Sequence, residues 1–169
     1  MNETSAHDSP ITTLFRHNLW ANLRLLDVCP GLSDEQLDAT LTGTFGAIRA
    51  TLFHIVSAED RYLNLLTGQP RDSRLARGQN PALATLRELA GQTGEALIQA
   101  AAQVKATDLT YPHWDGKRWP VPAATILTQA INHATEHRAQ INAILTQIGL
   151  DPPELDGWSY YLAHNADNS

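Results

Sequence analysis

The chain is poor in cysteine, in basic residues and in long apolar stretches, and each shortage excludes a class of protein. Its single cysteine, Cys29, cannot form an intramolecular disulfide, which fits a reducing compartment. Lys and Arg total 12 against 18 Asp and Glu, a formal charge of −6. This balance argues against nucleic acid as a partner, because neutralising phosphates requires a basic surface. No run of about 18 apolar residues occurs, so we expect no membrane-spanning segment and no membrane partner.

The remaining composition is that of a globular protein. Of 169 residues, 43% are hydrophobic and 18% are charged, which predicts a single domain over residues 1–169. Residues 1–8 are polar and acidic, unlike a signal peptide, so we expect a cytoplasmic protein. We expect residues 1–9 and 162–169 to be flexible. Cys29 is predicted to be a packing residue near a helix end, with a reactive thiol as the alternative.

Hydrophobic residues recur at helical spacing in four segments, which predicts an all-α four-helix bundle. The segments cover residues 10–29, residues 46–67, a third stretch opening at Asn80 and Pro81, and a fourth ending near Ile148. Functional sites in such bundles are built from side chains that project between facing helices.

Two local features interrupt this pattern. Gly91 and Gly94 weaken the third helical segment, because glycine has a low helix propensity. Asp115 and Gly116 form the dipeptide typical of a tight turn, and short flanking segments predict a hairpin excursion before the last helix.

The most informative pattern is a pair of histidines, His133 and His137, on the apolar stripe of the fourth segment. Their i, i+4 spacing places both imidazoles on one helix face, where they can reach one ion. Two buried imidazoles without a partner would be costly, and a divalent metal compensates both. His54, at the centre of the second segment, is predicted as the third ligand. Three protein ligands leave an open coordination position, as in catalytic metal sites.

The same pentapeptide also matches His-x-x-Glu-His, the pattern of inverted zinc peptidases, in which Glu136 would be a catalytic general base. That mechanism needs a distant glutamate as third ligand. The only glutamate after His137 is Glu154, which directly follows two prolines and not a helical stripe. We therefore place Glu136 on the flank of the helix.

Other residues are candidates for supporting roles. His17 and Trp20, in the first segment, are candidate substrate-binding residues, with structural or surface roles as the alternative. Glu59 and Arg138 each lie shortly after a predicted ligand. They could form an ion pair behind the metal, and we favour a surface or rim pair.

At these residues the chain resembles the DinB-like (DinB/YfiT) family of metalloenzymes. The resemblance covers nearly the whole chain and combines an opening helix, two ligand motifs and the end of the last helix. The matching segments are residues 14–22, 52–59 and 132–141, together with Gly149, Leu150 and Pro152 or Pro153.

The resemblance implies an up-down-down-up four-helix bundle, often dimeric, with a zinc or nickel ion on His54, His133 and His137. Trp20 and other apolar residues of the first helix would then contribute to a homodimer. Characterised relatives are mostly transferases, and an isomerase, that use low-molecular-weight thiols such as bacillithiol or mycothiol.

The sequence therefore predicts a divalent-metal-dependent enzyme, a thiol S-transferase acting on a small electrophile with a thiol cosubstrate. A metal-bound thiol loses its proton, which agrees with this chemistry. Two alternatives stay open: a metal-dependent hydrolase, and a non-catalytic metal-binding stress-response protein.

Overall fold

Four long helices make up most of the structure, a computed structural model that describes residues 9–166. The elements in chain order are α1 (Pro10–Val28), a 3₁₀ turn (Cys29–Gly31), α2 (Asp34–Leu37), α3 (Ile48–Thr67), a second 3₁₀ turn (Ser73–Leu75), α4 (Leu83–Gln103), β1 (Leu109–Thr110), β2 (His113–Trp114), β3 (Lys117–Arg118), β4 (Val121–Pro122), α5 (Ala123–Gln147) and α6 (Gly157–Asn165). The predicted all-α bundle is confirmed.

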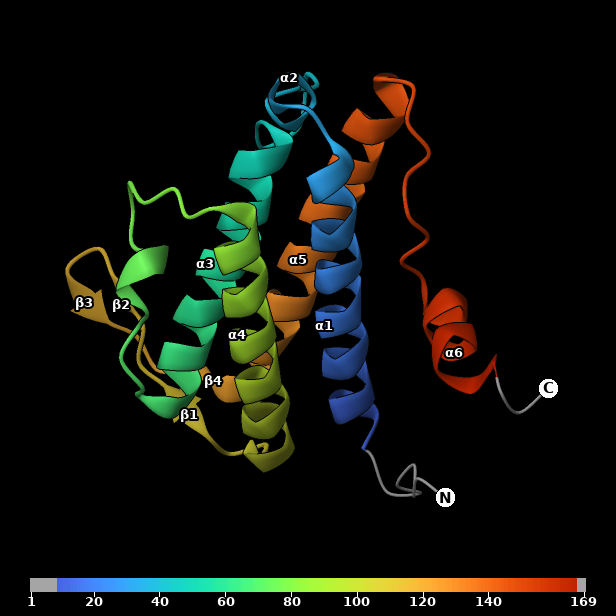
Figure 1. Ribbon diagram of the computed structural model, residues 1–169. Coiled ribbons are helices and arrows are strands. Elements are labelled where there is room, and N and C mark those ends of the chain that lie inside the picture. Colours follow the sequence, from blue (N-terminus) through green and yellow to red (C-terminus); the bar gives the residue numbers. More distant parts are fainter. Residues whose placement is uncertain (1–8, 167–169) are drawn as a thin grey trace.

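The long helices α1, α3, α4 and α5 run up, down, down and up, as the colours of Figure 1 show. The α1 helix packs against α4 and α5, and α3 packs against the same two helices from the other side. The two helices with the predicted metal ligands, α3 and α5, are therefore neighbours that run in opposite directions.

Two helix ends follow clear local sequence signals, and one helix begins later than the sequence predicts. Ser9 caps α1 by accepting a hydrogen bond from the Thr12 amide, with proline in the first turn. Gly68 ends α3 in the left-handed conformation, at φ 74°. The later start is that of α4, which begins at Leu83 and not at the predicted Asn80 and Pro81.

Gly94 is needed where α1 and α4 pack. A Cβ atom at this position would clash with the Leu19 Cδ1 atom and would lie 3.2 Å from the Leu19 Cβ atom. Gly91, one turn earlier, has open space at the same place. Gly94 therefore allows close packing of the two helices, a role that its low helix propensity alone did not indicate.

The predicted excursion before α5 is confirmed as two nested antiparallel ladders. Strands β2 and β3 pair around Asp115 and Gly116, whose φ angles of 49° and 73° fit a tight hairpin turn. Strands β1 and β4 pair outside them and lead directly into α5.

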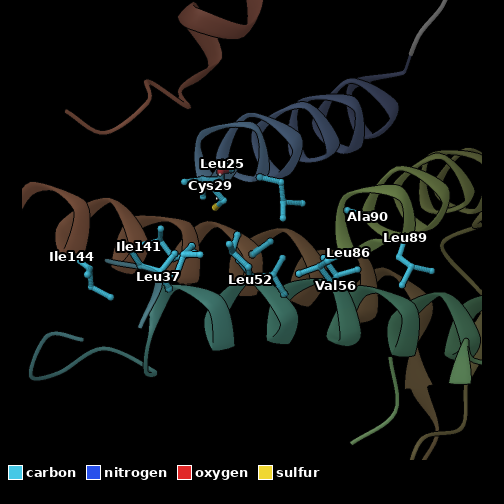
Figure 2. Close-up of a cluster of buried hydrophobic side chains, with 14 of the residues drawn as sticks. Leu25, Cys29, Leu37, Leu52, Val56, Leu86, Leu89, Ala90, Ile141 and Ile144 are labelled. Carbon is cyan, nitrogen blue, oxygen red and sulfur yellow. Dashed lines mark hydrogen bonds between the residues drawn. The ribbon is translucent and has the colours of Figure 1, made fainter. Parts of the chain in front are cut away.

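The core divides into two apolar clusters. Figure 2 shows the first, with Leu25 of α1 and Cys29 of the following 3₁₀ turn facing side chains of the other three long helices, among them Leu52 of α3, Leu86 of α4 and Ile141 of α5. The second contains Phe15, Leu19, Leu63, Leu97 and Leu127, among others. The predicted packing role of Cys29 is confirmed, because its thiol is buried in the first cluster and donates to the Leu25 carbonyl oxygen.

The α6 helix was missed from the sequence. Residues 162–165, predicted to belong to a flexible tail, form its last turn, and residues 1–8 and 167–169 lie outside the described residues. Asp156 caps α6 by accepting from the Trp158 and Ser159 amides. Figure 1 shows α6 beside α1. None of the helices in residues 9–166 combines the length and hydropathy needed to cross a bilayer.

Candidate metal centre

Three histidines from two helices meet on one side of the bundle. His54 projects from α3, and His133 and His137 project from one face of α5, one turn apart. One ligand nitrogen from each lies within 4.8 Å of the other two, and the Nε2 atoms of His54 and His133 are 2.9 Å apart. The structure therefore brings together the three residues that the spacing in the sequence selected.

Gln140 determines which nitrogen His137 presents. The Gln140 Oε1 atom lies 3.0 Å from His137 Nδ1 and accepts a hydrogen bond from the Phe45 amide, also at 3.0 Å. Because a carbonyl oxygen only accepts, His137 Nδ1 carries the proton and Nε2 keeps its lone pair. A partner of this kind fixes the tautomer and the ring orientation of a metal-binding imidazole.

Aromatic rings enclose the three imidazoles. The Phe45 ring stacks on His54, with a centroid distance of 4.1 Å and an interplanar angle of 16°, and meets His137 edge-on at 5.1 Å. Tyr62 meets His133 edge-on at 5.9 Å. These rings flank the imidazoles on two sides and hold them by packing.

The imidazoles of His54 and His133 are held in the neutral form. Burial, followed by the neighbouring His137, lowers the pKa of His54. Burial, His137 and His54 together lower the pKa of His133 to about 4. Metal ligation requires neutral imidazole, so the site is ready for a cation at neutral pH.

The donor set fits a divalent ion such as Zn²⁺ or Ni²⁺. Two nitrogens on one zinc ion, each about 2.0–2.1 Å from it at tetrahedral angles, lie about 3.3–3.4 Å apart. The 2.9 Å separation between His54 and His133 is shorter than this by less than about half an ångström, which a small ring rotation corrects. Within residues 9–166 the cluster contains no carboxylate or thiol, so the protein supplies three neutral donors.

The weaker candidates lie elsewhere. Glu136 is exposed, and its carboxylate accepts from the Gln140 amide at 3.5 Å. His17 donates to the Leu155 carbonyl oxygen and packs with Trp20 against Tyr160 of α6. In the described part of the chain neither His17 nor Trp20 has a ring contact with the three imidazoles. The Trp20 face, predicted to contribute to a dimer, is partly covered by the protein's own α6.

Comparison with known proteins identifies the family. A sequence model described as the DinB family matches residues 1–167. The chain belongs to the DinB family. The family assignment and the helical fold predicted from the motifs are thereby confirmed.

A solved structure supports the same fold. The chain is similar to a DinB-like protein from Bacillus cereus ATCC 10987, with 22% sequence identity and a TM-score of 0.62. The similarity covers 82% of this chain and 91% of that one. At this identity the likeness concerns the fold alone. No curated protein matches this DinB-family sequence.

A buried polar network lies directly behind the imidazoles, and the predicted surface pair of Glu59 and Arg138 is wrong. Glu59 is 0% exposed and Arg138 is 3% exposed. Asn18 and Asn22, one turn apart on α1, bridge them: both amides donate to Glu59 Oε1 at 2.7 and 2.8 Å, and both amide oxygens accept from Arg138 Nη1 at 2.7 Å. Arg138 also donates to Thr135.

This network joins the helices that hold the ligands. Glu59 lies five residues after His54 on α3, and Arg138 directly follows His137 on α5. Through the two asparagines of α1, the network fixes the register of α3 against α5. Burial raises the pKa of Glu59, whereas Asn18, Asn22 and Arg138 act in the opposite direction.

Sequence reasoning missed three parts of the site. Asn18 and Asn22 have the same i, i+4 spacing on an apolar stripe that singled out the histidines, so the same argument could have found them. Gln140 lies three residues after His137 and was within reach of a helical-face argument. Phe45 carries no local signal, because a loop places it.

Proposed function

We propose that this DinB-family protein is a divalent-metal-dependent enzyme that transfers a small thiol to an electrophile. His54, His133 and His137 would hold Zn²⁺ or Ni²⁺. One observation carries the proposal: three imidazole nitrogens converge within 4.8 Å, and within residues 9–166 the cluster holds no fourth protein ligand. Three ligands with an open position are the arrangement of catalytic metal sites.

A bound ion would lower the pKa of a thiol or a water molecule in the open coordination position. The chain's own residues prepare this position. Gln140 keeps the lone pair of His137 Nε2 available, and Phe45 and Tyr62 pack their rings against His54 and His133. Three neutral donors leave the double positive charge uncompensated, which favours an anion, such as a thiolate, over a neutral ligand.

The proposed reaction is a nucleophilic substitution or addition by sulfur. The thiol loses its proton to solvent, and its sulfur forms a bond to the electrophilic atom of the second substrate. In a substitution the leaving group departs with the bonding electron pair; in an addition the pair stays on the substrate and takes up a proton. A metal-dependent hydrolase would use the same site with water in place of the thiol.

The test replaces the native ion with Co²⁺ and follows the absorption spectrum while a neutral thiol, 2-mercaptoethanol, is added. We expect about one metal ion per chain, and a sulfur-to-metal charge-transfer band that strengthens between about pH 6 and pH 8, because the thiol must ionise to bind. His133→Ala should abolish tight metal binding, because two nitrogens are too few.

His113→Ala is the matched control, since His113 lies exposed on β2, outside the site, and its loss should leave the metal content unchanged. If saturating thiol leaves the Co²⁺ spectrum unchanged, the transferase proposal fails, and a hydrolase or a non-catalytic metal protein takes its place. If His133→Ala keeps full metal occupancy, the site assignment itself is wrong.

A further inference from the structure

A pocket of about 590 Å³ opens beside the candidate metal centre. It lies between α3 and the loop that precedes α4, and its wall includes Phe45, Ala50, Phe53, His54 and Arg77. Its size is within the range of small-molecule binding sites, which are mostly apolar with a few polar groups that select the ligand.

One wall of this pocket belongs to the metal centre. His54 lines the pocket and is also one of the three clustered histidines. Ala50 lies one turn before His54 on the same face of α3, and Ala47 immediately precedes the helix; their small side chains leave room next to the His54 ring. Phe45 and Phe53 provide aromatic surface at the same opening. A molecule seated here would lie within reach of a ligand at the metal.

The charges around the pocket leave one cation without a counterion. Arg49 and Asp38 both line the pocket and pair with each other at 3.2 Å, and Arg49 also binds Asp34 at 2.7 Å. Arg77, in the loop on the opposite wall, is exposed, and no hydrogen bond or ion pair to it occurs within residues 9–166. Its planar guanidinium has donors that match a carboxylate or phosphate bidentately.

We propose that this pocket binds the oxyanion end of the substrate, a carboxylate or phosphate, with Arg77 as the residue that determines specificity and Phe45 and Phe53 as the apolar walls. The inference rests on the proposed function, because it assigns the reacting end of the same substrate to the metal. The oxyanion belongs either to the thiol or to the electrophile, and the experiment separates these two sources.

The first arm needs neither metal nor activity. Binding of 3-phenylpropionate and of its neutral amide to the chelator-treated protein is measured by calorimetry. We expect the carboxylate to bind at least about tenfold more tightly than the amide, because charge-assisted, bidentate hydrogen bonds are stronger than neutral ones. Arg77→Gln should remove this preference.

Arg74→Gln is the matched control. Arg74 lies in the same loop but is paired with Asp72 at 2.8 Å and does not line the pocket, so its loss should leave the preference intact. Equal binding of acid and amide to the unmodified protein, binding of neither, or a preference that survives Arg77→Gln would each overturn the proposal.

The second arm uses Co²⁺-loaded protein and compares N-acetylcysteine with its amide through the charge-transfer band. An acid preference that Arg77→Gln removes assigns the oxyanion to the thiol. If the acid is preferred only with 3-phenylpropionate, in the first arm, the oxyanion belongs to the electrophile. A missing band with every thiol refutes the transferase function, whereas the first arm still decides the anion pocket.

Discussion

Replacing Arg138 with methionine tests whether the buried network holds the bundle together. The change keeps most of the apolar stem but removes the guanidinium. Glu59 therefore loses the positive charge of Arg138 nearby. Three hydrogen bonds, to Asn18, Asn22 and Thr135, are lost as well. Removing one partner of a buried charge pair typically costs about 3–5 kcal/mol. We expect Arg138→Met to lower the free energy of unfolding by about 4 kcal/mol.

The stability lost in Arg138→Met should increase with pH, because the variant leaves Glu59 buried without the arginine. Burial raises the pKa of Glu59, and Arg138 is one of the groups that counteract this rise, so its removal raises the pKa of Glu59 further. A carboxyl with a raised pKa holds a proton in the folded state that the unfolded state releases above about pH 4.3. Stability then falls as pH rises, so the deficit of Arg138→Met should be larger at pH 8 than at pH 5.

The assay is chemical denaturation followed by circular dichroism at both pH values. Arg61→Met is the control, because Arg61 is exposed on α3 and should cost less than about 0.5 kcal/mol. Adding Glu59→Gln to Arg138→Met should recover at least about 1 kcal/mol, since the uncompensated charge is then gone. The reasoning is refuted if Arg138→Met behaves like the control, or if Glu59→Gln deepens its deficit.

Three further predictions concern the thiol, the helix packing and the assembly. Burial raises the pKa of Cys29 to about 11, so alkylation of the native protein at pH 8 should be roughly a hundredfold slower than in denaturant, and equal rates would contradict the buried position. Gly94→Ala should lower the free energy of unfolding by about 1–2 kcal/mol, because the new methyl group clashes with Leu19. Gly91→Ala, which has open space, should raise the free energy of unfolding by up to about 1 kcal/mol. If denaturant unfolding shows changes of the same sign for both variants, the close-packing argument is refuted. We propose that the protein forms a homodimer, as the family resemblance implies, and that the exposed Trp158, Tyr161 and Leu162 of α6 belong to its interface. Leu162→Glu should then weaken dimerisation at least about tenfold, and a monomeric mass by light scattering at tens of micromolar counts against the dimer.

The candidate ligands could be read from the sequence because helical periodicity is a local property. Spacing alone put His133 and His137 on one face of a helix, on a stripe where the period requires apolar residues. Ser9 and Gly68, which the structure places at helix ends, are local signals of the same kind, because capping depends on a few neighbouring backbone groups. The α6 helix was overlooked because it is short and none of its described residues is buried, so its apolar pattern is weak.

The main wrong prediction was the surface location of Glu59 and Arg138, and the surroundings of the two side chains explain why. A glutamate and an arginine on separate helices are typical surface residues, and nothing close to them in the sequence indicates burial. Asn18 and Asn22 allow burial by hydrogen bonding to both, and these asparagines lie on a third helix. Whether a buried polar group finds hydrogen-bond partners depends on the groups that tertiary packing brings near it.

The sequence by itself determined the four long helices, the turn before α5, the family and the choice of three histidines as candidate ligands. Each of these depends on the local spacing of residues or on short sequence motifs. Only the tertiary structure decided that Gln140 orients His137, that Phe45 covers His54, that the Glu59 and Arg138 charges are buried, and that Arg77 faces a pocket beside the metal centre. These contacts join residues from different helices and loops. The antiparallel packing of α3 and α5, and the loops that fold back on them, therefore determine the chemistry around the three nitrogens.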